Sequence, residues 1–84
     1  SMYSIDYARL AKHIKENDAK RVMIQLPDGL KARAEEIQRR LEQETDAELL
    51  FWAGSNFGAC DLPVGLDKLG VDLLIHLGHT EWVY

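Results

Sequence analysis

The stretch Leu-Leu-Phe-Trp-Ala-Gly-Ser-Asn-Phe-Gly-Ala-Cys-Asp at residues 49–61 decides the fold. Its apolar first part, Leu49 to Ala53, is typical of a strand that is buried on both faces of a parallel sheet. A glycine-rich turn follows, in which the backbone can approach a ligand closely. Asp61 and Pro63 are residues that commonly begin a helix. The stretch therefore predicts a strand, a loop and a helix whose first N–H groups face the loop.

Cys60 lies in this loop and is the only cysteine in the chain. A deprotonated thiol at a strand end can bind a metal or act as a nucleophile, and functional groups concentrate on such loops. The alternative is a small, buried, apolar filler. The residues alone leave both interpretations open. Because a single cysteine forms no internal disulfide, we predict a reducing compartment, the cytoplasm.

The chain has 84 residues, of which 46% are hydrophobic and 29% charged, with a formal net charge of −4. This length allows one small α/β domain, and the negative charge argues against a nucleic-acid-binding protein, which normally has a basic face. No apolar run reaches the roughly 18 residues that span a bilayer, so we expect no membrane segment. We take Ser1 for a remnant of tag removal. Because Tyr84 completes no helix or strand, we expect residues 1–84 to be an N-terminal fragment of a longer protein.

Helices and strands alternate along the rest of the chain. The first helix has an apolar stripe at positions spaced three and four apart, with Ser4 as its predicted cap. Pro27-Asp28-Gly29 is a strong turn signal after the first strand. In chain order we predict a helix at 4–17, a strand at 21–26, a helix at 30–44, a strand at 47–53, a helix at 61–70 and a strand at 72–77.

This alternation predicts a three-stranded parallel sheet in a small three-layer α/β/α unit. Right-handed crossovers with helices on both faces give the strand order 2-1-3, which resembles half of a Rossmann sheet. In such sheets, ligands bind beyond the carboxyl ends of the strands. The sequence therefore predicts a site where the three loops after the strands meet.

Each of these loops carries glycine together with an ionisable group or a thiol. Asp28, next to Gly29, could bind a ligand hydroxyl or amine, or could cap the second helix. His79, after the third strand, could act as an acid, a base or a ligand, or could be a solvated loop residue. His76, inside that strand, reads as a hydrogen-bonded structural residue. Cys60, His79 and Asp28 match no recognised metal-ligand spacing, so the chain alone predicts no complete metal site.

Three segments of the chain resemble the N-terminal domain of the diphthamide-synthesis 3-amino-3-carboxypropyl transferases. They are Gln25-Leu-Pro-Asp-Gly-Leu30, then Phe57-Gly-Ala-Cys-Asp61, then Ile75-His-Leu-Gly-His79. Their order and spacing are also similar to those of the family. The second segment, with its cysteine after a strand, is the most specific of the three.

The resemblance implies a catalytic subunit of three similar domains, each giving one cysteine to a 4Fe–4S cluster, with Cys60 as the first ligand. It implies cleavage of S-adenosylmethionine at this cluster by radical chemistry. The 3-amino-3-carboxypropyl group is then transferred to a histidine of translation elongation factor 2, the first step toward diphthamide. Asp28, Gly29, Gly58 and His79 are the expected cofactor-binding residues. Members work as homodimers or as heterodimers of paralogous subunits.

The chain departs from the family in holding one of the three expected cysteines. We therefore expect residues 1–84 alone to be catalytically inactive. Thr80-Glu81-Trp82 after His79 also differs from the small and then apolar residues that are more usual in the family.

Two other functions remain open at this stage. Cys60 could be a nucleophile in acyl or phosphoryl transfer, with His79 as its base. Alternatively, the chain could be a small binding or regulatory domain of the receiver type. A receiver would need an acidic cluster at the strand ends, where the sequence supplies only Asp28 and Asp61.

Overall fold

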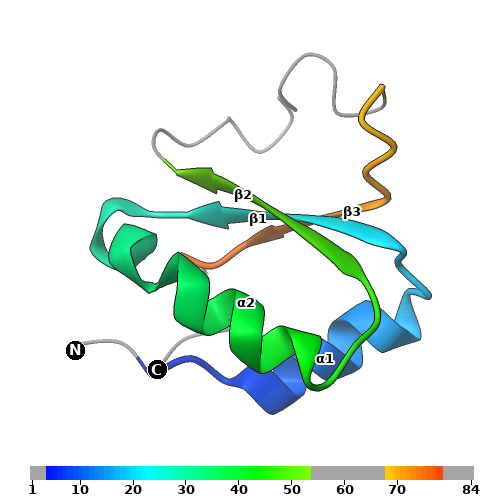
Figure 1. The fold of residues 1–84 in the computed structure, drawn as a ribbon, viewed down its shortest axis with the longest axis horizontal. Coiled ribbons are helices and arrows are strands. Elements are labelled where there is room, and N and C mark those ends of the chain that lie inside the picture. The colour runs from blue at the N-terminus through cyan, green and yellow to red at the C-terminus, as the bar shows by residue number, and fades with distance from the viewer. Residues whose placement is uncertain (1–3, 54–67, 79–84) are drawn as a thin grey trace.

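The structure is a computed structural model that describes residues 4–53 and 68–78 (Figure 1). Within these ranges the helices and strands follow one another largely as the sequence predicts. In chain order they are α1 (Tyr7–Glu16), β1 (Arg21–Leu26), the 3-10 helix η1 (Asp28–Arg33), α2 (Ala34–Glu42), β2 (Glu48–Ala53) and β3 (Leu73–His76).

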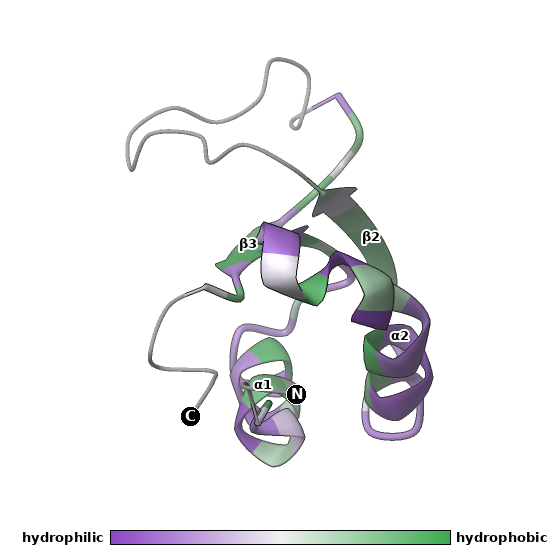
Figure 2. Ribbon diagram, turned by 90° about the vertical axis from the view of Figure 1, so that its left-hand side faces the viewer, coloured by the Kyte–Doolittle hydropathy of each residue, from purple (hydrophilic) through white to green (hydrophobic). Residues whose placement is uncertain are grey.

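The three strands form one sheet in the order β2-β1-β3, and β1 pairs in parallel with both neighbours. This confirms the predicted sheet and its strand order. Arg21 lies opposite Glu48 at one end of the β1–β2 pair, and Leu26 lies opposite Ala53 at the other. Helices α1 and α2 both lie on one face of the sheet (Figure 2). The helix predicted for the other face, at 61–70, falls outside the described residues except for 68–70, which form a turn.

The core fills the space between this face and the two helices. The predicted stripe of α1 is buried along its whole length, as are Ile37 and Leu41 of α2. From the sheet, β1 contributes Ile24 and Leu26, and β3 contributes Ile75. Burial of these side chains is the main stabilising contribution to the unit.

Two helix starts differ from the prediction. Asp6 rather than Ser4 caps α1, because its Oδ1 accepts a hydrogen bond from the Arg9 N–H at 3.1 Å. The second helix does not begin as an α-helix at residue 30, because residues 28–33 form the 3-10 helix η1. Gly29 disfavours an α-helical first turn, and short 3-10 turns are common where a helix starts. Leu30 is nevertheless fully buried, so η1 is attached to the core.

Polar contacts join the strands at their amino ends. The Asp72 carboxylate accepts hydrogen bonds from the backbone N–H groups of Lys20, at 3.0 Å, and Arg21, at 3.2 Å. These backbone donors lower the pKa of Asp72. Arg21 Nη2 lies 2.9 Å from Glu48 Oε2, and Arg21 Nη1 donates to the Leu69 carbonyl. Arg21 and Asp72 thus fix where β2 and β3 begin relative to β1.

A second polar network joins α1 to α2. The Tyr7 hydroxyl donates to Glu36 Oε2, and Arg33 donates to both oxygens of the same carboxylate, at 3.2 and 2.8 Å. Arg40 lies over the Tyr7 ring, with its guanidinium carbon 4.4 Å from the ring centroid. The bonds from Arg33 and Tyr7 lower the pKa of Glu36 to about 2. Burial, with the bond to Glu36, raises the pKa of Tyr7 to about 12.

Replacing Glu36 by glutamine is expected to lower the free energy of unfolding of this chain by about 1 kcal/mol at neutral pH. A hydrogen-bonded charge contributes more than this when buried, but solvent screens a side chain that is 37% exposed. Because folding lowers the pKa of Glu36, the difference between wild type and variant is full above its ordinary value of 4.5 and disappears as the pH falls toward about 2. Urea unfolding across this pH range measures it.

Glu35→Gln is the matched control, because Glu35 also lies in the first turn of α2 and is exposed. Its effect should be small and should not follow the titration of Glu36. Equal losses in the two variants would contradict a specific role for the Tyr7–Glu36–Arg33 network.

Candidate functional site

The carboxyl ends of the three strands lie at one edge of the sheet. Leu26 ends β1, Ala53 ends β2 opposite it, and His76 ends β3 opposite Gln25 of β1. The loops after β1 and β3 therefore leave the sheet from this carboxyl edge, where β2 also ends (Figure 1). This is the edge at which open parallel sheets bind their ligands.

The loops after β1 and β3 begin side by side. The Leu77 N–H donates to the Gln25 carbonyl at 3.1 Å, which extends the pairing of the two strands by one bond. Gly78 follows next to the Pro27 ring, so that a Cβ built on this glycine would lie 3.7 Å from Pro27 Cγ. The structure thus brings the residue before His79 to the turn that contains Asp28.

Asp28 and Gly29 are the first two residues of η1 at this edge. The Asp28 side chain is 89% exposed and forms an ion pair with Lys31, with 3.1 Å between Oδ1 and Nζ. It does not cap the second helix, because Pro27 precedes η1 and Arg33 precedes α2, and neither start has a side-chain cap bond. An exposed carboxylate with a single surface ion pair can exchange that partner for a ligand.

Gly58 and Cys60 lie within 54–67, and His79 lies within 79–84, which are outside the described residues. Their roles therefore stay predictions. Among residues 4–53 and 68–78, no three histidine, cysteine or acidic side chains are grouped as a metal site. In the same part of the chain, no helix is long and apolar enough to cross a membrane.

Sequence reasoning gave no role to Gln25, which the structure places at this edge. Gln25 is 2% exposed and is the buried polar residue of the described core strands. Its Oε1 is hydrogen-bonded to Nδ1 of His76, the neighbouring residue on β3. A hydrogen-bonded His76 agrees with the prediction for that residue. The feature of the sequence that could have indicated a role for Gln25 is its position as a polar residue among the apolar residues of this strand.

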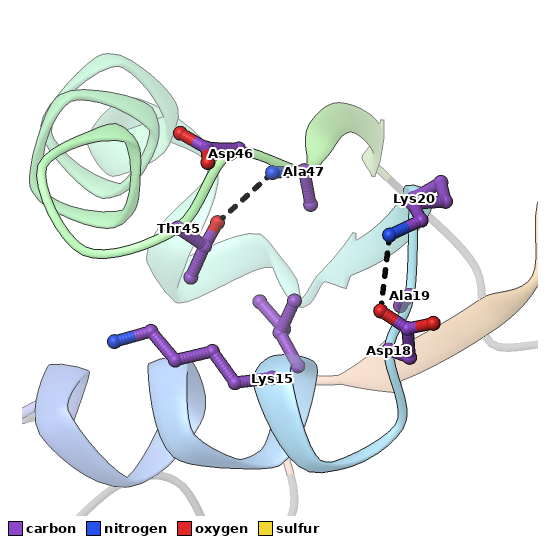
Figure 3. Close-up of a pocket in the computed structure, with 8 residues that line it drawn as sticks. Lys15, Asp18, Ala19, Lys20, Thr45, Asp46 and Ala47 are labelled. Atoms are coloured by element: carbon purple, nitrogen blue, oxygen red, sulfur yellow. Dashed lines mark hydrogen bonds and ion pairs between the residues drawn. The ribbon is translucent and has the colours of Figure 1, made fainter.

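A cavity of about 210 Å³ lies at the opposite end of the sheet, between the end of α1 and the turn before β2 (Figure 3). The positive and negative side chains that line it are equal in number. Lys20 forms a 3.0 Å ion pair with Asp18, and Lys15 and Asp46 also line the cavity. The Thr45 hydroxyl accepts from the Ala47 N–H at 3.3 Å and shapes one wall. These contacts stabilise turns at the amino ends of the strands, away from the edge where a parallel sheet binds ligands.

The parallel sheet, its strand order and the two helices on one face (Figure 2) define a small α/β unit. A family model described as "Putative diphthamide synthesis protein" matches residues 26–84. The chain therefore belongs to the diphthamide synthesis protein family. The resemblance in its three sequence segments is confirmed.

Relatives in this family are much longer than the chain. The 2-(3-amino-3-carboxypropyl)histidine synthase of Pyrococcus horikoshii is 42% identical over 80 residues, which cover 94% of this chain and 23% of the relative. Subunit 1 of the human synthase is 33% identical over 81 residues, covering 95% of this chain and 18% of the relative. The chain thus spans about a quarter of the curated relatives or less.

Solved structures give the same family. The crystal structure of Dph2 from Pyrococcus horikoshii matches with a TM-score of 0.70 and 38% identity, over 89% of this chain and 22% of that one. The crystal structure of the same protein with a 4Fe–4S cluster matches with a TM-score of 0.69 and 39% identity, over 87% of this chain. At 38% and 39% identity, these two structures support both the family of the chain and the fold of the unit.

Asp28→Asn is expected to change the free energy of unfolding by less than about 0.5 kcal/mol, because it removes only an exposed ion pair. Leu30→Ala, two residues away but fully buried, should lower it by about 2–5 kcal/mol. Urea unfolding of both variants makes the comparison. A loss at Asp28 as large as that at Leu30 would contradict a carboxylate that is available to a ligand.

Proposed function

We propose that the protein containing this chain transfers the 3-amino-3-carboxypropyl group of S-adenosylmethionine to a histidine of translation elongation factor 2. The observation that carries the proposal is the match to Dph2 crystallised with a 4Fe–4S cluster, at 39% identity over 87% of this chain. The names of the relatives, 2-(3-amino-3-carboxypropyl)histidine synthases, give the product of the reaction. We further propose that the protein is cytoplasmic and acts as a homodimer or a paralogous heterodimer.

Cys60 is the residue of this chain that would bind the cluster. Iron–sulfur clusters are held by cysteine thiolates, and Cys60 is the only one available here. It comes seven positions after Ala53, the residue at which β2 ends at the carboxyl edge. One thiolate fits one ligand position, so the remaining ligands would come from other parts of the full-length protein. Residues 1–84 alone would then be inactive.

When bound, the cluster would supply the electron that cleaves the bond from the sulfur of S-adenosylmethionine to its aminocarboxypropyl carbon. The residues of this chain would bind and orient the S-adenosylmethionine. Asp28 offers an exposed carboxylate to a hydroxyl or amine of the ligand. Gly29 and Gly58 would let the backbone approach it closely, and His79, the residue after Gly78 in the sequence, would offer a ring nitrogen. The cofactor carries the difficult chemistry, and the protein positions its reactants.

Cys60→Ala is expected to abolish cluster assembly in the full-length protein, because each cysteine ligand holds one corner of the cluster. Anaerobic reconstitution with iron and sulfide, followed by visible absorption and iron content, measures assembly. Transfer of label from S-adenosylmethionine to elongation factor 2 measures activity, which should be lost with the cluster.

Ser55→Ala, a change of similar size in the same loop, is the control and should reconstitute as wild type does. A Cys60→Ala variant that binds as much iron as the control would rule out the ligand role. A wild-type protein that assembles the cluster but transfers no label would rule out the proposed reaction and leave the ligand role intact.

A further inference from the structure

Asp28 is the one aspartate of the chain that precedes a glycine. The carboxyl carbon Cγ of an aspartate lies within reach of the backbone nitrogen of the next residue, and attack by that nitrogen closes a cyclic imide. A side chain on the next residue obstructs this attack, and glycine has none. Asp28 and Gly29 therefore supply the least hindered pair of reacting atoms among the aspartates of this chain.

The reacting carboxyl group is open to solvent. The Asp28 side chain is 89% exposed, and its ion pair with Lys31 Nζ lies at the surface. Such an ion pair holds a side chain only weakly, so the carboxyl group can turn from Lys31 toward the backbone. Water, which the reaction releases and later consumes, reaches this group from bulk solvent.

The reacting nitrogen is not held by a hydrogen bond. The first backbone bond of η1 runs from the Leu30 N–H to the Pro27 carbonyl at 2.9 Å, so Gly29 comes before the bonded part of this helix. Within residues 4–53 and 68–78, the structure gives the Gly29 N–H no acceptor. No hydrogen bond to this N–H has to break before the nitrogen attacks.

The other aspartates of the described ranges are held more firmly. The N–H that follows Asp6, Asp18 or Asp46 is hydrogen-bonded, to the Ile5 carbonyl at 3.1 Å, to the Ile14 carbonyl at 3.2 Å and to Thr45 Oγ1 at 3.3 Å respectively. The Asp72 carboxylate itself accepts the backbone N–H groups of Lys20 and Arg21. In these ranges, Asp28 alone combines a carboxyl group held by a surface ion pair with an unbonded nitrogen on the next residue.

We propose that Asp28 converts spontaneously to isoaspartate at the carboxyl edge of the sheet. The Gly29 nitrogen forms a bond to Asp28 Cγ, and one water leaves with the carboxyl hydroxyl and the amide proton. Another water then adds to the main-chain carbonyl carbon of the imide and breaks its bond to the Gly29 nitrogen. The two steps together gain and lose no atoms, and neither needs an oxidant or a reductant. Addition of water at Cγ instead restores aspartate.

Isomerisation changes the backbone where η1 begins. The chain then runs through Cβ and Cγ of residue 28, and the former main-chain carboxyl becomes the free carboxylate. Because Leu30 is fully buried, the added carbon displaces the exposed residues before it rather than the core. The partner that fits the product is a methyltransferase that recognises an isoaspartyl carboxylate. The modification does not depend on the reaction proposed for the whole protein.

The test ages the folded full-length protein at neutral pH and physiological temperature, and maps isoaspartate by mass spectrometry of its peptides. Ageing in H₂¹⁸O labels each site that has passed through the imide, and methylation by an isoaspartyl methyltransferase tests the partner class. We expect isoaspartate to accumulate at residue 28 at a rate close to that of the protein unfolded in urea. The other aspartates of residues 4–53 and 68–78 should stay unchanged in the folded protein.

Two variants test the reacting atoms. Gly29→Ala adds a methyl group beside the attacking nitrogen, and the backbone accepts it because Gly29 does not occupy the left-handed region. Asp28→Glu keeps a carboxylate but would have to close a larger ring. Both variants should lose most of the modification at residue 28.

A folded wild type that forms no isoaspartate at residue 28, while the unfolded protein does, would overturn the proposal, because the native turn would then keep the two atoms apart. So would equal accumulation in wild type and Gly29→Ala. Equal accumulation at the other aspartates of the described ranges would overturn the selectivity argued from their hydrogen bonds. None of these outcomes bears on cluster assembly or on transfer to elongation factor 2.

Discussion

The parallel pairing of β1 with both of its neighbours is the constraint on which the rest of the structure depends. Since all three strands run the same way, the chain must cross back over the sheet after β1 and again after β2. Each crossing starts at the carboxyl edge and ends at the amino edge. The two edges of the sheet therefore differ in the contacts that their residues make. Arg21 and Asp72 join the amino edge through a dense set of polar contacts, while the carboxyl edge keeps exposed groups such as Asp28.

Successive side chains of β1 project to opposite faces of the sheet, so its apolar core residues and its buried polar residue lie on different faces. Ile24 and Leu26 project to the face that α1 and α2 cover, and they are buried in an apolar core. Gln25, between them, projects to the other face, so a polar group can be buried without interrupting that core. Burying an amide without a partner would be unfavourable, and the bond to His76 offsets this penalty. A one-residue shift in the register of β1 would exchange the two faces and place Gln25 in the core.

Much of this fold could be predicted because it depends on patterns that are local in sequence. The stripe of α1 and the alternation of helices with strands were sufficient for the sheet order, since handedness leaves few topologies. The 3-10 start of the second helix was missed because propensity and periodicity do not distinguish its first turn from an α-helix. The bond from Tyr7 to Glu36 joins residues 29 apart in sequence, and only tertiary packing brings them together. At the site, topology correctly predicted that the loops after β1 and β3 meet. The sequence could not indicate the role of Gln25, because its hydrogen-bond partner, His76, lies on β3 and is brought next to it only by the fold.

The two ends of η1 are held very differently, and this matters for any ligand at the carboxyl edge. At its far end, Arg33 is bonded to the Glu36 carboxylate, which also joins α2 to α1 through Tyr7. In its middle, Leu30 is buried in the core. At its near end, the Asp28 side chain is exposed and paired only with Lys31 at the surface. The backbone of η1 is therefore fixed before a ligand arrives, and little ordering of the loop remains to oppose binding. The Asp28 side chain stays free to rotate from Lys31 toward a ligand, because a surface ion pair holds it only weakly. A preorganised backbone with an adjustable carboxylate suits a site that binds a ligand with a hydroxyl or amine group.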